Sequence, residues 1–274
     1  LVDDDLLQLD ENANKRIIDI STGIGGRSIA LDPNRGLLYI GDHSGNVTAM
    51  SLSDSEPLVD FPVDTNSSLS DPILTMGVDV FGVLWAISEC NMHYLMPSKG
   101  ALWKTLEFCT SSEIEIPIGI HIDDRTIFLA TEESGVRVIE YNVSASDFTS
   151  LDIERNVVWD DSNLLSGNSI ADVAVSGDIL YIATSDSGID RLDLSSDSWM
   201  PSWTSSNWLS SDNIVGLATA PGWLYILAEE QVQPYDTDLL LFSSEIQLQS
   251  LGLDTASSIS AWPGGLPRGP SESM

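Results

Sequence analysis

Basic residues are scarce in this sequence. It holds 11 lysines and arginines against 42 aspartates and glutamates, which gives a formal net charge of −31 at pH 7. Nucleic-acid-binding proteins neutralise phosphates with clustered lysine and arginine, and anionic membrane surfaces attract polybasic segments. We therefore exclude nucleic acid as a partner and expect no attraction to anionic membranes. Because salt screens repulsion between surface carboxylates, the charge favours a protein from a marine or halophilic microbe.

Long hydrophobic runs and helical periodicity are also missing. No apolar stretch approaches the roughly 18 residues of a membrane-spanning helix, and the most hydrophobic segment, residues 78–87, contains Asp79. No run keeps a 3.6-residue period over ten or more residues. The acidic first residues, LVDDDLL, do not resemble a signal peptide, so we expect the native protein to begin upstream. The sequence predicts an all-β protein without direct membrane insertion.

Cysteine is limited to Cys90 and Cys109. Two predicted strands around a turn at residues 98–101 separate them, and folding that hairpin about its midpoint places the two cysteines opposite each other. Antiparallel partners lie about 4.5–5.5 Å apart at Cα, which a disulfide tolerates. We predict a disulfide, and with it an extracellular, periplasmic or cell-surface location. Two buried free thiols are the alternative.

Other signals of location and chemistry are weak. N-glycosylation sequons begin at Asn46, Asn66 and Asn142, and chance can supply several in a chain rich in serine and asparagine. The three histidines, His43, His93 and His121, show no metal-ligand spacing. No Gly-x-Ser-x-Gly nucleophile motif occurs. We therefore assign no catalytic residue and expect no cofactor apart from a possible calcium ion.

A repeat of 40–50 residues organises the chain. Each unit contains a short apolar strand centred on an aromatic residue, and successive aromatics are 46, 43, 53 and 44 residues apart. These aromatics are Tyr39, Trp85, Phe128, Tyr181 and Tyr225. A polar, acidic loop between residues 142 and 163 explains the longest spacing. Four short strands in each unit are typical of a β-propeller blade.

The blades can be placed approximately. We predict one domain, residues 1–274, with complete blades at 23–65, 71–110, 114–153, 164–203 and 209–248. Residues 1–20 look like half a blade and residues 256–274 like a weak other half, so we expect a sixth blade shared between the two ends. Such closure removes an exposed sheet edge. Seven blades, or an array cut from a longer protein, are alternatives.

Two of the repeats resemble a known family. The segments LLSGNSIADVAVSGDILYIATSDSGIDRLD and LSSDNIVGLATAPGWLYILAEEQVQPYD are similar to the repeat of two-component-regulator propellers, the extracytoplasmic sensing region of certain hybrid histidine kinases. Residues 82–85 echo the same repeat. Tyrosine or phenylalanine replaces its tryptophan in most blades, and Gln231 replaces a turn glycine. The resemblance implies a propeller fold and extracellular ligand or partner binding, and it implies no catalytic residues.

A carboxylate follows the aromatic strand in every blade, within the turn that leads to the third strand. These residues are Asp42, Glu89, Glu132, Glu133, Asp186, Glu229 and Glu230. Equivalent turns of a propeller gather on one face, so the sequence predicts an acidic ring that could bind calcium or another cation. Ordinary solvated turns, which favour aspartate, are the alternative.

The tryptophans Trp159, Trp199, Trp203 and Trp208 offer a second candidate surface. Tryptophan forms stacking platforms for sugars and anchors for protein interfaces, whereas packing between blades is the structural alternative. We hypothesise a non-enzymatic binding or sensing module of a larger surface protein, with an unknown protein, a glycan or a small cationic ligand as partner. A glycan-processing lyase or glycosidase is the alternative, and an inverting hydrolase would need two carboxyl groups about 6.5–9.5 Å apart.

Overall fold

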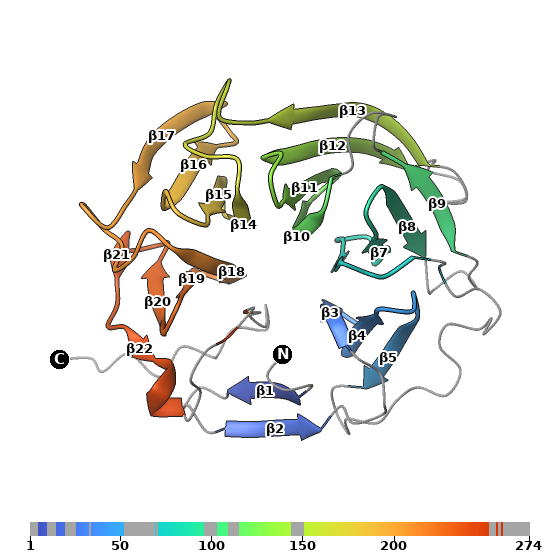
Figure 1. Ribbon diagram of the computed structural model, residues 1–274, viewed down its shortest axis with the longest axis horizontal. Helices are drawn as coiled ribbons and strands as arrows, with labels where there is room; N and C mark the ends of the chain where they lie inside the picture. Colours follow the sequence, from blue (N-terminus) through green and yellow to red (C-terminus); the bar gives the residue numbers. More distant parts are fainter. Residues whose placement is uncertain are drawn as a thin grey trace.

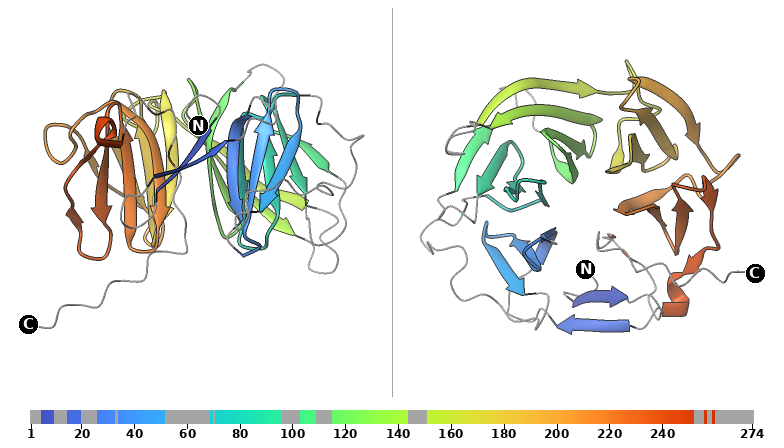
Figure 2. Two further views of the ribbon diagram at one scale, coloured as in Figure 1. Left: turned by 90° about the horizontal axis from the view of Figure 1, so that it is seen from below. Right: turned by 180° about the vertical axis from the view of Figure 1, so that it is seen from behind.

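The computed structural model describes residues 5–9, 15–19, 26–32, 34–51, 69, 71–95, 103–108, 115–143, 151–251, 256 and 259. Within these ranges the chain forms small antiparallel sheets that stand around one axis like the blades of a wheel (Figure 1). Strands run along the axis in the side view (Figure 2), so the wheel is about one strand thick. This confirms the predicted all-β propeller.

Six sheets follow one another along the described chain, and in each complete blade the strands run outward from the axis in chain order (Figure 1). They are β1 (Asp5–Leu9) and β2 (Lys15–Asp19); β3 (Gly26–Asp32), β4 (Leu37–Asp42) and β5 (Val47–Ser51); β6 (Thr75–Val78), β7 (Leu84–Ile87), β8 (Asn91–Leu95) and β9 (Lys104–Glu107); β10 (Pro117–Asp123), β11 (Thr126–Thr131), β12 (Val136–Val143) and β13 (Leu151–Trp159); β14 (Ile170–Ser176), β15 (Ile179–Thr184), β16 (Ile189–Asp193) and β17 (Ser198–Trp203); and β18 (Ile214–Ala220), β19 (Trp223–Ala228), β20 (Gln231–Asp236), β21 (Leu241–Phe242) and β22 (Ile246–Gln247). A 3-10 helix follows at Leu248–Leu251.

The sheet β1–β2 lies between the last and the first of the other sheets (Figure 1). This is the place predicted for the N-terminal half of a sixth blade. Most of the C-terminal segment predicted to complete that blade, residues 256–274, lies outside the described residues.

The aromatic residues that marked the repeat lie on the second strands and form layers between blades. Tyr39 and Trp85 are fully buried, and Tyr39 belongs to the same apolar cluster as Leu84 on the next blade. Trp85 packs in turn with Ile127, and Tyr181 with Leu224. Neighbouring blades cover both faces of these strands, which explains why they read as nearly continuous apolar runs. Burying each such side chain stabilises the fold by about 1.5–3 kcal/mol.

The third blade corrects one prediction. Residues 142–163 do not form only a loop, because β13 occupies Leu151–Trp159 as the outer strand and pairs with β12. The sheet therefore extends six residues beyond the predicted boundary at residue 153. Leu151 and Ile153 pack towards the preceding blade and Val157 and Trp159 towards the next, with a register shift between the two pairs. The central residues 154–156 are exposed and polar. Those polar residues concealed the strand in the sequence.

In three blades a turn glycine contacts the connection that leads to the next blade. The φ angles are 78° at Gly45, 83° at Gly135 and 86° at Gly188, values that glycine adopts at little energetic cost. A Cβ atom on Gly45 would lie 1.7 Å from the carbonyl oxygen of Leu69, and one on Gly188 would lie 2.1 Å from that of Trp203. Only a residue without a side chain allows this approach between the turn and the outer chain.

Buried polar side chains occupy one position of the third strands: His93, Arg137, Asp190 and Gln233. The last three hydrogen-bond the connection that leads into their blade, at Glu115, Ser166 and Ser210, whereas His93 bonds within its own blade. The backbone N–H and the hydroxyl of Ser166 both donate to the Asp190 carboxylate at 2.8 Å. Hydrogen bonds of this kind satisfy groups that are costly to bury unpaired, so they fix how each connection crosses its blade.

The cysteine hairpin has a register different from the one predicted. Asn91 pairs with Glu107, and the backbone N–H of Phe108 donates to the carbonyl of Cys90 at 3.0 Å. Phe108 therefore takes the position opposite Cys90 that was predicted for Cys109. The sequence does not fix the turn length between the two strands, so it did not fix their register. Cys90 is disulfide-bonded, whereas Cys109 lies outside the described residues and its pairing stays a prediction.

Candidate functional site

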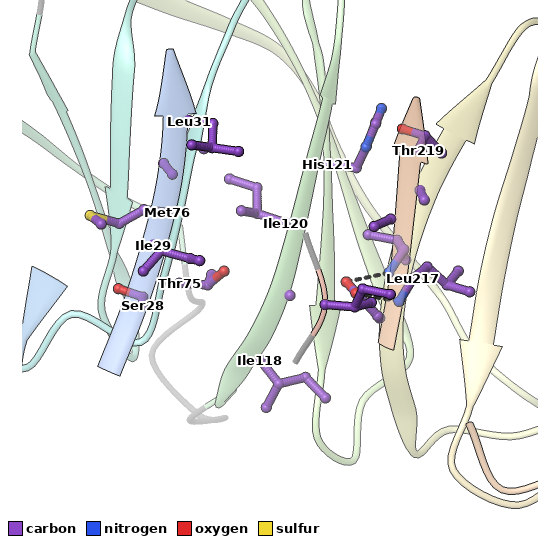
Figure 3. A pocket seen from close by; sticks show the side chains of 18 of the residues that line it. Ser28, Ile29, Leu31, Thr75, Met76, Ile118, Ile120, His121, Leu217 and Thr219 are labelled. Atoms are coloured by element: carbon purple, nitrogen blue, oxygen red, sulfur yellow. Dashed lines mark hydrogen bonds between the residues drawn. The ribbon is translucent and has the colours of Figure 1, made fainter. Parts of the chain in front are cut away.

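A cavity of about 360 Å³ lies on the axis of the wheel. The innermost strands β3, β6, β10, β14 and β18 line it, together with Ile259. Figure 3 shows the aliphatic side chains of Ile29, Leu31 and Ile120 on its wall, with His121 and Thr219 towards one end and Ile118 towards the other. Concave cavities of this volume are the usual form of small-molecule sites.

The innermost strands contribute small or polar residues at one level of this cavity, which we call the collar. Each collar residue pairs with the residue two positions after the aromatic marker of its blade. The collar consists of Ser28, Thr75, Gly119, Asp172 and Gly216. In four of the blades a register shift precedes the collar residue, as between Ile170 and Asp172. Such bulges redirect the following side chains.

Asp172 supplies the carboxylate of the collar, and it is the acidic residue among the described residues that line the cavity. Its Oδ1 accepts a hydrogen bond from the backbone N–H of Val173, and its Oδ2 accepts one from that of Leu217 on the next blade, both at 2.8 Å. A Cβ atom on Gly119 would lie 2.5 Å from Oδ1. The carboxylate therefore occupies space that the collar glycine leaves free. Burial raises the pKa of Asp172 to about 7, although both backbone hydrogen bonds favour the charged form.

His121 projects from β10 two residues after the collar glycine, about 7 Å further along the strand. The equivalent residues on the other inner strands are Ala30, Gly77, Ala174 and Ala218. Burial lowers the pKa of His121 to about 4, so the ring is neutral at physiological pH. A neutral imidazole offers one hydrogen-bond donor and one acceptor.

Asp172 and His121 give opposite pH dependences of stability. Between about pH 4 and 7 folded Asp172 holds a proton that the unfolded chain has lost, so its contribution falls as pH rises. Between about pH 4 and 6.5 the unfolded chain protonates His121 and the folded chain does not, so its contribution rises with pH. As pH rises from about 4 to 7, the free energy of unfolding of Asp172→Asn should increase relative to that of the wild type. As pH rises from about 4 to 6.5, that of His121→Gln should decrease relative to that of the wild type. Urea unfolding at several pH values measures both, and pH profiles parallel to wild type would contradict the assignment.

The predicted acidic ring separates into two kinds of carboxylate. Asp42 is buried, and its carboxylate accepts hydrogen bonds from the backbone N–H groups of Ser44 and Asn46 and from the Asn46 side chain. It organises its own turn. The others are exposed at the surface: Glu89, Glu132, Glu133, Asp186, Glu229 and Glu230. In the part of the chain that the structure describes, no group of three or more histidine, cysteine, aspartate or glutamate side chains is placed to hold a metal ion. Calcium binding stays a prediction.

The exposed turn carboxylates nevertheless share an end of the wheel with the collar. Ile170 pairs with Thr184, so the beginning of β14 lies beside the turn that carries Asp186. Asp172 is two residues further in. Negative charge around the mouth of a cavity raises the local concentration of cations, so these turns favour the approach of a cation to the collar from this end.

The other predicted residues lie away from the axis or outside the description. Asn46 and Asn142 are exposed, and the side-chain amide of Asn142 donates to Glu154 at 3.2 Å. Asn66 lies outside the described residues, and glycosylation stays a prediction. His43 is exposed in its turn, whereas His93 is buried and hydrogen-bonds Ser88 and Thr105 through its two ring nitrogens.

The four candidate tryptophans differ in how far they are buried. Trp203 is buried between blades, with the Arg191 guanidinium 4.3 Å from its ring centroid. Trp159 and Trp199 are half-buried and meet edge to face at 5.8 Å. Trp208 is 61 % exposed and stacks on Phe242, and the leucines of residues 239–241, which precede Phe242 in the chain, are exposed as well. Exposed apolar patches on soluble proteins mark contact surfaces, and this one lies on the outer edge of the last complete blade.

The axial site contains a residue that sequence reasoning missed. Asp172 was not among the candidate residues, and His121 was noted only for its lack of metal-ligand spacing. A signal was present, because alignment of the repeats places Asp172 where the other inner strands have Ser28, Thr75 and two glycines. The described lining residues hold one carboxylate, so they do not form the carboxylate pair that an inverting glycosidase needs.

Comparison with known proteins gives similarity in structure alone. No family model matches the chain, and no curated protein matches its sequence. Among solved structures, a chain of the nidogen/laminin complex has a TM-score of 0.61 at 12 % identity, with 93 % of this chain and 92 % of that chain covered. Sqt1 of Saccharomyces cerevisiae has a TM-score of 0.60 at 9 % identity, with 87 % and 78 % covered. A computationally designed protein, Ika8, has a TM-score of 0.54 at 8 % identity, with 90 % and 72 % covered.

None of the helices among the described residues has the length and apolar character that crossing a membrane requires. The structural neighbours share less than 25 % identity with this chain, so they show its fold and leave its ligand open. The chain is a β-propeller.

Proposed function

We propose that this protein is a non-enzymatic binding propeller, located outside the cytoplasm, that recognises a ligand in its axial cavity as a module of a larger surface protein. The observation that carries the proposal is the cavity of about 360 Å³ with an aliphatic wall and one carboxylate in its collar. The volume of this cavity lies within the range of small-molecule pockets.

Two further observations support the location and the role. Cys90 is disulfide-bonded, and structural disulfides persist mainly in oxidising compartments. The resemblance of residues 164–248 to two-component-regulator propellers favours extracytoplasmic sensing as the finer role. Mass spectrometry after alkylation of the natively produced protein tests the location. Modification of Cys90 and Cys109 before reduction would contradict the predicted bridge and remove this support.

Methionine NMR tests the proposal directly. Met76 lies on the cavity-lining strand β6, with its side chain buried in the adjacent apolar cluster, whereas Met200 lies on the outer strand β17. In protein labelled with ¹³C at the methionine methyl groups, a library of small amines, alcohols, sugars and carboxylic acids should include compounds that shift the Met76 resonance and raise Tm. The Met200 resonance is the internal control and should stay in place. A library that leaves Met76 unchanged at millimolar concentration would contradict axial recognition.

A further inference from the structure

We infer that the axial cavity selects a primary ammonium group carried on an aliphatic body, with Asp172 as its anion partner. This inference rests on the proposed function and names the class of ligand. Three features of the cavity support it: the unused acceptor positions of the Asp172 carboxylate, the aliphatic side chains on the wall, and the imidazole of His121 further along the axis.

The collar carboxylate has acceptor positions to spare. An ionised carboxylate has about four lone-pair positions, and the backbone N–H groups of Val173 and Leu217 use two of them. No lysine or arginine is found among the described residues that line the cavity. An ionised group enclosed without a counter-charge is unfavourable, and a ligand that brings a positive charge with N–H donors removes that penalty.

The side chains on the cavity wall favour an aliphatic body for the ligand. Ile29, Leu31 and Ile120 present aliphatic side chains to the cavity (Figure 3). Quaternary ammonium groups are held by aromatic cages, and the described lining residues include no phenylalanine, tyrosine or tryptophan. A trimethylated head group also has no N–H to donate to Asp172. The cavity therefore favours a primary ammonium over its trimethylated analogue.

His121 adds a position for a second contact. It lies about 7 Å further along the axis than the collar, and its neutral imidazole offers one hydrogen-bond donor and one acceptor. A ligand with an ammonium at the collar and a polar group a few carbons away would reach both levels.

The test compares four probes with one alkyl chain. Hexylammonium, 1-hexanol, hexyltrimethylammonium and hexanoate are titrated into the full chain at about pH 8, where Asp172 is ionised. The Met76 methyl resonance and calorimetry give the affinities. Because a charge-assisted hydrogen bond contributes more than a neutral one, hexylammonium should bind at least about tenfold more tightly than hexanol and hexyltrimethylammonium. Hexanoate should bind most weakly.

Matched variants assign the effect to the collar. Asp172→Asn should lower the affinity for hexylammonium to that for hexanol and leave hexanol binding unchanged. Asp186→Asn removes an equal charge from an exposed turn of the same blade and should change neither affinity by more than about twofold. If Asp172→Asn fails to fold, the comparison of the four probes on the wild-type protein still tests the selectivity. Equal binding of hexanol and hexylammonium would overturn the cation selectivity and leave the binding cavity in place, whereas no Met76 shift with any probe would contradict both.

Discussion

Replacing Trp85 by alanine should lower the free energy of unfolding by about 3–5 kcal/mol. The indole is fully buried between blades, with ring centroids 5.5 Å from Tyr94 and 4.9 Å from Tyr141. Its Nε1 donates to Asp79 at 3.3 Å. The substitution therefore opens a large cavity and removes a hydrogen bond from a buried carboxylate. Chemical denaturation of the full chain measures the loss.

The matched control is the same substitution at an exposed tryptophan. Trp208→Ala removes an indole that is 61 % exposed, so it should cost less than about 1 kcal/mol. Similar losses at both positions would show that burial between blades is not what makes Trp85 important. The comparison would then count against the explanation given for the aromatic marker of the repeat.

Glu115→Ala should destabilise the fold by about 3–5 kcal/mol, because it leaves a buried guanidinium without its counter-charge. Arg137 and Glu115 are 5 % and 4 % exposed and form a two-point ion pair, in which Arg137 Nε donates to Glu115 Oε2 at 2.8 Å. The remaining Arg137 hydrogen bond, to Asn156, does not neutralise the charge. Replacing both partners by methionine should recover most of the loss.

An exposed ion pair on the same blade provides the control. Arg155 and Glu140 meet at 2.8 Å, but their side chains are 48 % and 39 % exposed. Solvent screens this pair, so Glu140→Ala should cost less than about 1 kcal/mol. Equal losses for Glu115→Ala and Glu140→Ala in urea unfolding would contradict the role assigned to the buried pair.

The repeat could be found in the sequence because its cause is local. Each second strand is covered on both faces, so residues around Tyr39, Trp85 and Tyr181 had to be apolar and aromatic whatever their exact neighbours. The outer strand β13 was missed for the opposite reason. It is the outermost strand of its sheet, and its exposed centre, residues 154–156, has the composition of a loop.

The axial site depended on features that no local pattern reveals. The bulge between Ile170 and Asp172 inserts one residue into β14, and one extra residue reverses the face of every side chain that follows. Regular alternation would have placed Asp172 on the opposite face of its strand. The register of the Cys90 hairpin shifted by one residue in the same way, because turn length sets register.

By itself, the sequence determined that the protein is all-β, repeated in blades of 40–50 residues and strongly acidic, because strand periodicity, turn residues and charge are properties of neighbouring residues. The tertiary structure decided which of those residues meet. The arrangement of the blades around one axis brings Ser28, Gly119, Asp172 and Gly216 to one level. Packing against Tyr181 and Tyr235 buries Trp203, whereas Trp208 stays exposed. The pKa of Asp172 follows from that enclosure, since desolvation depends on what surrounds a group in space.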